Sequence, residues 1–588
     1  MTITIEGNAI AQPAHPVHPL GSRARILLTS VFGPYAKDDE FGGRAANPME
    51  LCHNQVTRLQ RAFSLRMFHR SWGIMLIQAN ISAPCTVLDF PTLDRFIQEI
   101  KTHKYDIVGI SAIMTNVGKV KKMCEEVRRH LPEATILVGG HVANMPGLGE
   151  RIEVDHVVKG EGVRWMRRFL DEDEDQPIRH PRIPAVIGMR TMGLNIPLKG
   201  TEMPATLIPS VGCPLGCNFC STSAMFGGKG KSVAFYESAD DLFKVMCELE
   251  RDMNVRSFFV MDENFLLHRK RALRLLDLMV KHNKPWALFV FSSANAIRLY
   301  TMEQLVALGI SWVWMGLEGE GAEYGKLKGT DTRDLVRTLQ SHGIRVLGSS
   351  IIGLEEHTPD NLDAAIGYAL SHETEFHQFM LYTPSPGTPL HDELEAKGLM
   401  LDPKECSLGD ITGQIQFNFR HPHIKDGQET EFLNKAFLRD FELNGPSIIR
   451  IAETTLRGWQ RYKNHPDARI RDRYKWEARH LPYGFAAALW AARSWYRSDR
   501  DLHARISGVL NDIYREFGLK ARLAAPLLGG VLRITLGLEN RRLRRGWAYE
   551  PPTFYETNNK TSAATHSEPG KGTTAAIRFT PPASPSLP

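Results

Sequence analysis

The chain has 588 residues, of which 43% are hydrophobic and 23% charged, with a formal net charge of +6. These values are typical of a soluble globular protein with three or four domains. The charge is small for this length, and no basic stripe with interleaved aromatic residues stands out, so the sequence argues against a nucleic-acid partner. The first residues do not resemble a signal peptide, and no run of about 18 uncharged apolar residues predicts a transmembrane helix. We therefore expect a cytoplasmic protein.

The first part of the chain predicts a disordered segment followed by an α/β domain. Residues 1–22 are rich in Pro, Ala and His and are expected to be disordered. From 23 to 192, short apolar strands alternate with amphipathic helices, which predicts a parallel Rossmann-like or flavodoxin-like sheet with helices on its faces. The predicted strands lie at 24–33, 84–90, 105–113, 134–140 and 155–162.

A second alternating series occupies residues 193–415. Six strands separated by helices predict a partial (β/α)6 barrel, in which the chemistry sits at the carboxyl ends of the strands. The predicted strands lie at 206–212, 257–264, 286–295, 312–319, 345–354 and 376–383.

The rest of the chain has a different pattern. Helical segments rich in Arg and Trp dominate residues 416–550, and the polar, Pro-, Ser- and Thr-rich residues 551–588 predict a disordered tail. Apolar runs beside Arg and Trp fit an ordinary helical bundle on the barrel, and they also fit helices held at a membrane interface. His421 and His423 lie in a segment that we interpret as a solvated loop and not as a metal site.

Three of the eight cysteines, Cys213, Cys217 and Cys220, form a CxxxCxxC motif at the end of the first predicted barrel strand. Thiolates are the usual ligands of iron–sulfur clusters, and three cysteines leave the fourth iron of a 4Fe–4S cluster open to a small molecule. A zinc knuckle and three inert buried thiols are the alternatives, but structural zinc usually takes four ligands. The scattered Cys85, Cys124 and Cys247 are interpreted as small core residues.

The CxxxCxxC motif with Phe219 before the last cysteine resembles the radical S-adenosylmethionine (SAM) superfamily, and later strand ends match it in order. The resemblance implies that SAM is contacted near Asp262, Glu263 and Asn264 after the second strand, and at Ser292 after the third. It places a ribose contact at Glu318, adenine packing at Ile352 and Gly353, and a TPxPGTP turn beginning at Thr383. It names no catalytic residue.

The N-terminal sheet, just upstream of this barrel, resembles the cobalamin-binding domain of the same superfamily. The resemblance implies that the slot for the nucleotide tail of cobalamin is lined by residues at three strand ends: Ser111, Thr115, Gly139, Gly140, Gly160, Glu161 and Gly162. A sheet that binds nothing and only docks on the barrel is the alternative. The chain lacks DxHxxG, so no protein imidazole is expected below cobalt, and His141 is interpreted as a loop residue and not a metal ligand.

Together these resemblances imply a cobalamin-dependent radical SAM enzyme that methylates an unactivated carbon of a small-molecule or lipid substrate. Cyclisation or carbon–carbon coupling is the nearest alternative, and a non-catalytic corrinoid- or redox-sensing protein is the alternative of another class. The resemblance also implies an electron donor such as flavodoxin or ferredoxin. Contact with a membrane surface stays open.

Overall fold

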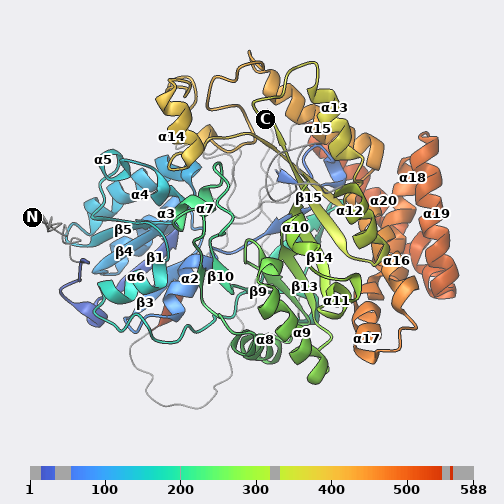
Figure 1. Ribbon diagram of the computed structural model, residues 1–588, viewed down its shortest axis with the longest axis horizontal. Coiled ribbons are helices and arrows are strands. Elements are labelled where there is room, and N and C mark those ends of the chain that lie inside the picture. The colour runs from blue at the N-terminus through green and yellow to red at the C-terminus, as the bar shows by residue number, and fades with distance from the viewer. Residues whose placement is uncertain (1–14, 34–54, 199, 318–331, 546–556, 561–588) are drawn as a thin grey trace, which may run out of the picture.

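The computed structural model describes residues 15–33, 55–198, 200–317, 332–545 and 557–560. Figure 1 shows three parts side by side: a sheet from the N-terminal third on the left, a second sheet in the centre, and a group of C-terminal helices on the right.

The N-terminal sheet has the strand order β17-β3-β1-β4-β5-β6, and all of its strands except β17 run parallel. Hydrophobic clusters lie on both of its faces, where the helices cover it. The predicted Rossmann-like sheet is therefore confirmed. Its strands are β1 (Ile26–Ser30), β3 (Cys85–Leu88), β4 (Ile107–Ser111), β5 (Thr135–Gly139), β6 (His156–Val158) and β17 (Thr557–Lys560), and its helices are α2 (Trp72–Ala79), α3 (Leu93–Thr102), α4 (Val117–His130), α5 (Leu148–Arg151) and α6 (Gly162–Phe169).

Two segments expected to be disordered contribute to this domain. The backbone amide of His18 donates to the carbonyl of Phe169 at 2.8 Å, and a short 3₁₀ turn follows at Gly21–Arg23, so order begins before residue 22. Strand β17 lies inside the predicted disordered tail and pairs antiparallel with β3. Composition did not predict it because an added edge strand gains main-chain hydrogen bonds whatever its side chains are.

The central sheet is entirely parallel, with the order β9-β12-β13-β14-β15-β16. The predicted (β/α)6 arrangement is confirmed. The strands are β9 (Ala205–Leu207), β12 (Ser257–Val260), β13 (Ala287–Phe291), β14 (Ile310–Gly316), β15 (Arg345–Ile352) and β16 (Phe376–Leu381). The helices are α7 (Ser221–Met225), α8 (Ala239–Met253), α9 (Arg269–Lys281), α10 (Ala294–Ile297), α11 (Met302–Ala307), α12 (Thr332–Ser341), α13 (Leu362–Leu370) and α14 (Pro389–Ala396).

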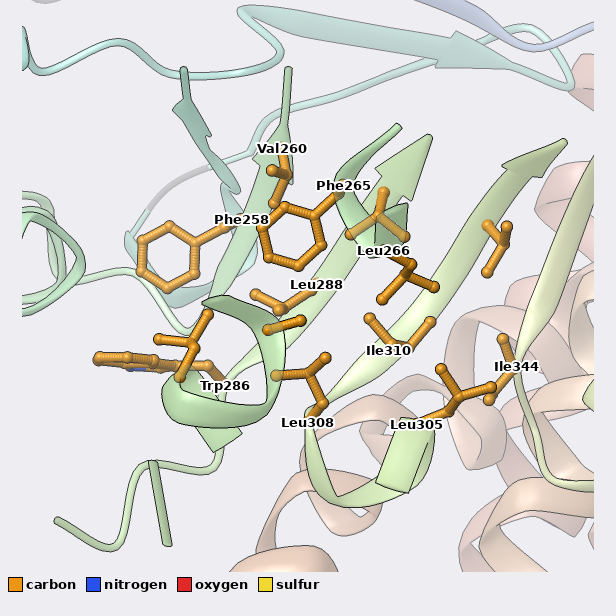
Figure 2. Close-up of a cluster of buried hydrophobic side chains, with 14 of the residues drawn as sticks. Phe258, Val260, Phe265, Leu266, Trp286, Leu288, Leu305, Leu308, Ile310 and Ile344 are labelled. Carbon is orange, nitrogen blue, oxygen red and sulfur yellow. The ribbon is translucent and has the colours of Figure 1, made fainter. Parts of the chain in front are cut away.

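The two faces of the central sheet differ. Alternate strand residues such as Phe258, Leu288 and Ile310 are fully buried beneath the helices, as Figure 2 shows. The residues between them point to the inner face, where Phe259, Phe289, Phe291, Trp312 and Trp314 stay half-buried. Ring centroids of neighbouring residues there lie 4.9–5.7 Å apart, so the inner face is a continuous aromatic wall.

The C-terminal part is helical, as predicted. Its helices are α15 (Gln428–Asn444), α16 (Ser447–Tyr462), α17 (Ala468–Glu477), α18 (Ala486–Trp495), α19 (Arg500–Phe517) and α20 (Leu519–Arg544). A small antiparallel sheet that the sequence did not predict joins α20 to the rest, through a salt bridge of 2.7 Å between Arg190 and Glu539. Its strands are β2 (Arg66–Phe68), β7 (Gly188–Thr191) and β8 (Leu194–Ile196), which are too short to give a clear period. By length and composition alone, α20 is long and apolar enough to cross a membrane, which the sequence did not lead us to expect.

The two sheet domains come into close contact at Gly387. After β16, the turn at Gly387 lies against the 3₁₀ turn His141–Asn144 that follows β5. Gly387 has a φ of +81°, and a Cβ added there would stand 2.1 Å from the carbonyl oxygen of Asn144. Only glycine fits this contact, which brings the carboxyl ends of both sheets together.

Candidate functional site

The three-cysteine loop begins directly after β10 (Ser210–Val211), a short strand that follows β9 in the chain. Gly212 and Gly216 have φ values of +84° and +66°, and a Cβ on Gly216 would lie 2.4 Å from Cα of Lys229. The loop can fold back on itself only because both positions are glycine. Cys220 caps helix α7, since its Sγ accepts the amide hydrogen of Ser223 at a distance of 3.4 Å.

The donor set fits a cluster better than a structural zinc ion. The loop supplies three free thiols, Cys213, Cys217 and Cys220. Structural zinc usually takes four protein ligands. Three thiolates can each bind a different iron of a 4Fe–4S cluster and leave the fourth iron open.

The electrostatics of the loop agree with a metal site. Burial, together with the neighbouring Cys220 and Cys217, raises the pKa of the Cys213 thiol to about 11. Burial also raises the pKa of Cys220. Such thiols stay protonated at neutral pH until a metal displaces the protons, so they do not act as free nucleophiles, and their role as cluster ligands stays a prediction.

The segment after β12 carries Asp262, Glu263 and Asn264, which the sequence analysis assigned together to SAM contact and which have different surroundings in the structure. Asp262 is buried and used within the protein: it accepts a hydrogen bond of 2.7 Å from the Ser210 hydroxyl and pairs with Arg271. Asn264 accepts from the Ser292 hydroxyl and the Ser293 amide, each at 3.0 Å. These groups, Ser292 included, therefore fix the ends of the neighbouring strands.

Glu263 differs from its neighbours. Its Oε2 is buried without a hydrogen-bond partner, and burial raises the pKa of its carboxyl group to about 7. The same carboxylate raises the pKa values of Cys213 and Cys220, so it lies close to the cysteine loop. A buried carboxylate oxygen without a partner is costly unless a ligand completes it, and Glu263 is therefore the residue of this segment that is open to a ligand.

A cavity of 690 Å³ lies between the two sheets, within the range of small-molecule sites. The cysteine loop contributes Phe219, Ser221 and Thr222 to its wall, and the N-terminal domain contributes Thr115 and His141. The predicted residues Phe219, Thr115 and Thr383 thus share one cavity, and the cavity touches both domains that the sequence linked to cofactors.

The cavity wall contains polar residues that sequence reasoning missed. A chain of hydrogen bonds runs from Trp314 Nε1 to Ser349 Oγ at 2.7 Å, on to Gln378 Oε1 at 2.7 Å, and from Gln378 Nε2 to Gln55 Oε1 at 2.8 Å. All four residues line the cavity. Alternation along β14, β15 and β16 places three of them on the inner face, but Gln55 lies outside the strands, between β1 and β2, and gave no signal.

At the adenine position predicted after β15, two neighbouring isoleucines have different surroundings. The Ile352 side chain is buried in a hydrophobic cluster, whereas Ile351 lines the cavity. Gly353 has a φ of +81°, and a Cβ there would lie 2.2 Å from the Phe417 ring, so this glycine is required by packing. Their roles toward SAM stay predictions, and Glu318 lies outside the described residues.

A second pocket of 180 Å³ lies at the carboxyl end of the N-terminal sheet, where parallel sheets bind ligands. It collects six of the seven predicted cobalamin residues: Ser111, Gly139, Gly140, Gly160, Glu161 and Gly162. Its lining is almost entirely apolar, and a Cβ on Gly162 would stand 2.9 Å from the Ile77 side chain, so the glycines keep the slot open. Glu161 lies there because its carboxylate caps α6, accepting the amide hydrogens of Val163 and Arg164.

Thr115, which lines the cavity, and its neighbour Asn116 carry polar atoms without hydrogen-bond partners. The Thr115 hydroxyl and both amide atoms of Asn116 are buried and make no hydrogen bond. The corrin ring carries amide side chains that such groups can bond, so these residues fit cobalamin. Burial lowers the pKa of His141, whose Nε2 lies 3.2 Å from the Thr222 hydroxyl.

Other sequence interpretations have mixed outcomes. Cys85 and Cys124 are buried, as expected for core residues, and Cys247 is half-buried. His421 is not in a solvated loop: it is buried, and its Nδ1 accepts the amide hydrogens of His423 and Ile424. The ring closes a turn, a role that residue spacing did not reveal.

Comparison with known proteins agrees with this division of the chain. Residues 67–170 match the B12 binding domain family, and residues 207–369 match the Radical SAM superfamily. An uncharacterized methyltransferase of Pyrococcus horikoshii is 24% identical, over 60% of this chain and 82% of its own length. Bacteriochlorophyllide d C-12(1)-methyltransferase of Chlorobaculum tepidum is 27% identical, over 53% of this chain and 70% of its own. The anaerobic magnesium-protoporphyrin IX monomethyl ester cyclase of Rubrivivax gelatinosus is 23% identical, over 59% of this chain and 69% of its own length. The chain therefore carries a B12 binding domain followed by a Radical SAM superfamily domain.

Proposed function

We propose that this enzyme transfers a methyl group to an unactivated carbon of an apolar small molecule bound in the 690 Å³ cavity. The observation that carries the proposal is that this one cavity is walled both by the cysteine loop and by the N-terminal domain next to the 180 Å³ slot. A substrate there would meet a radical source on one side and a methyl source on the other.

The cofactors supply the difficult chemistry when bound: the 4Fe–4S cluster and SAM provide a hydrogen-abstracting radical, and cobalamin provides the methyl group. The protein positions them. Cys213, Cys217 and Cys220 would hold the cluster, and the open Oε2 of Glu263 is suited to accept the SAM ammonium group. Asp262 and Asn264 act through other residues, because their side chains are already bonded within the fold.

The cobalamin-binding residues would act mainly by shape. The slot glycines allow the nucleotide tail close to the backbone, and the unpaired Thr115 and Asn116 groups are suited to bond the corrin amides. Position 141 carries an imidazole that burial keeps neutral, at the cavity side of the domain. We infer no imidazole ligand below cobalt, since the chain has no DxHxxG.

The inner surface of the barrel indicates the substrate class. The aromatic wall of Phe259, Phe289, Phe291, Trp312 and Trp314 adjoins the cavity at Trp314. The side chains that line the cavity are otherwise apolar or neutral and polar, within the described residues. This surface suits a large apolar substrate with a few hydroxyl or carbonyl groups, such as an isoprenoid lipid, bound by dispersion and aromatic contact.

Cyclisation is a second candidate, and it is favoured by the similarity of this chain to a relative that is named as a cyclase. A non-catalytic sensor would need neither an open Glu263 oxygen nor a substrate cavity. We further propose a cytoplasmic location and a small electron-transfer protein, flavodoxin or ferredoxin, as the source of the reducing electron.

The test is anaerobic incubation of the reconstituted enzyme with reductant, cobalamin, deuterated-methyl SAM and a lipid extract. Methyl transfer gives 5′-deoxyadenosine and a product heavier by one labelled methyl group in place of hydrogen. Cyclisation gives 5′-deoxyadenosine with an unlabelled product. Absence of SAM cleavage under all these conditions would leave only the sensor.

A further inference from the structure

Helix α20 carries an exposed apolar stripe. Leu519, Leu523, Leu527, Val531, Ile534 and Leu538 follow one another at intervals of three or four residues, which places them on one helix face. Each is exposed, from 47% at Leu538 to 73% at Leu527. Soluble proteins seldom leave so many large aliphatic side chains together in water, and such a stripe marks a binding surface.

The opposite face of α20 is fixed to the protein. Ala521, Ala525, Gly529 and Leu536 are buried against the rest of the C-terminal helices, and a Cβ on Gly529 would lie 2.9 Å from the Ala487 carbonyl. Glu539 is buried on this face and bonds Arg190 at 2.7 Å. The helix therefore cannot leave its place to cross a bilayer, although its length and hydropathy would allow that. It can only lie along a surface.

The charges on α20 indicate which kind of surface the helix binds. Its sequence contains six cations and one acid, and the acid is the buried Glu539. Lys520 stands at the start of the stripe, and Arg541, Arg542 and Arg544 follow its end, all exposed. Cations at both ends of an apolar stripe match the layered structure of an anionic membrane, with headgroups beside acyl chains.

We propose that α20 binds the enzyme peripherally to an anionic phospholipid bilayer, lying in the membrane interface with its apolar stripe in the acyl region. The helices α18–α20 lie at the right of Figure 1, on the side away from the N-terminal sheet. A second copy of the chain fits less well. Whether two α20 helices met parallel or antiparallel, clusters of cations would face each other without exposed acids on either helix to balance them.

The experiment is co-flotation of the full-length protein with vesicles. We expect binding to vesicles that contain 30% phosphatidylglycerol, weaker binding to pure phosphatidylcholine, and a decrease as salt is raised, about tenfold in each comparison. The double substitution Leu527→Glu and Ile534→Glu should reduce binding at least tenfold. Leu443→Glu is the matched control, because Leu443 is a similarly exposed leucine (60%) on α15.

Both substituted residues of the double variant are exposed in the described chain, so circular dichroism and SAM cleavage should be unchanged. Arg541→Gln with Arg544→Gln should reduce the preference for anionic vesicles and keep the weak binding to neutral ones. If the wild type does not float with any vesicle, or if light scattering shows a dimer that the double variant converts to a monomer, the proposal is wrong.

Discussion

The Nε2 atom of His141 lies 3.2 Å from the hydroxyl of Thr222. His141 lies in the 3₁₀ turn that follows β5 of the N-terminal sheet, and Thr222 lies in helix α7, which Cys220 caps. This contact therefore ties the two cofactor-binding domains together at the cavity wall, next to the close approach of Gly387 and Asn144.

Thr222→Val removes this hydroxyl and keeps the side-chain shape. We expect iron content, cobalamin content and 5′-deoxyadenosine formation to stay near wild-type values, while methylated product falls about tenfold or more, because small displacements of reacting groups are costly. Product and 5′-deoxyadenosine are measured in the same reaction. Thr338→Val, at an exposed position on α12, is the control and should keep the two coupled. Equal losses of both in Thr222→Val would show that the contact is not specific to transfer.

Replacement of Cys213, Cys217 or Cys220 by Ala should abolish both the iron–sulfur chromophore and SAM cleavage. Each removed thiolate leaves one iron without a protein ligand. Iron and sulfide analysis after anaerobic reconstitution, with assay of 5′-deoxyadenosine, provides the measurement. Cys247→Ala, at a half-buried site on α8, should behave as wild type. Full activity in any of the three loop variants would contradict the cluster assignment.

Glu263→Gln should weaken SAM binding and leave the cluster intact. A charge-assisted hydrogen bond contributes about 1.5–3 kcal/mol, so the Kd for SAM should rise about 10- to 100-fold. Equilibrium binding to the reconstituted protein measures this, and the iron content of the same sample serves as the internal check. Glu356→Gln, at an exposed glutamate, should change neither quantity. Unchanged affinity in Glu263→Gln would mean that the buried carboxylate serves another group.

Gly139→Leu should block cobalamin binding by filling the 180 Å³ slot. The backbone allows the change, since a Cβ there meets Val158 only at 3.7 Å and φ is not positive. We expect the purified protein to retain little cobalamin but to cleave SAM normally. Absorbance of bound corrinoid gives the readout, with Gly149→Leu as a control at an exposed glycine that has open space around it. Normal corrinoid retention would place the tail elsewhere.

His180 predicts a loss of stability in mild acid. Burial lowers the pKa of this imidazole to about 4, and its Nε2 accepts the amide hydrogen of Ile208 at 3.0 Å. In the unfolded chain the same group binds a proton below about pH 6.5. The unfolded state therefore holds more protons, and the free energy of unfolding should fall as the pH drops from about 6.5 to 4.

Denaturant unfolding of the protein at pH 7 and at pH 5 tests this expectation. His180→Gln should have a smaller difference between the two pH values, because it removes one proton-binding group from the unfolded chain. It should also be less stable than wild type at pH 7, since the Ile208 bond is altered. An undiminished pH dependence would assign the effect to other buried histidines such as His377, whose pKa burial lowers to about 3.

The sequence predicted the two parallel sheets and the position of the cysteine loop because these depend on local signals. Strands buried on both faces appear as continuous apolar runs, and residues at strand ends meet at one edge whatever the details of packing. The same rule explains why glycines that follow different strands line one pocket, although it did not reveal that Glu161 is a helix cap.

The parts that sequence could not predict depend on contacts between distant segments. Asp262 and Glu263 are adjacent carboxylates, and only the positions of Arg271 and Ser210 decide which of them is already bonded. Ile351 and Ile352 differ only in which face of β15 they occupy. Gln55 reaches the cavity through a bond to Gln378, more than 300 residues away, and no local pattern encodes that distance.

The contact of Gly387 with the Asn144 carbonyl also bears on how such an enzyme can diversify. Because Gly387 has no side chain, the two domains can meet closely in one relative position. That position does not depend on the residues of the aromatic wall. Substitutions along the wall can therefore change which molecule is accepted while the geometry between the two reactive centres is inherited unaltered. The glycine at position 387 therefore sets how the two domains meet, whereas the residues of the aromatic wall set which substrate is bound.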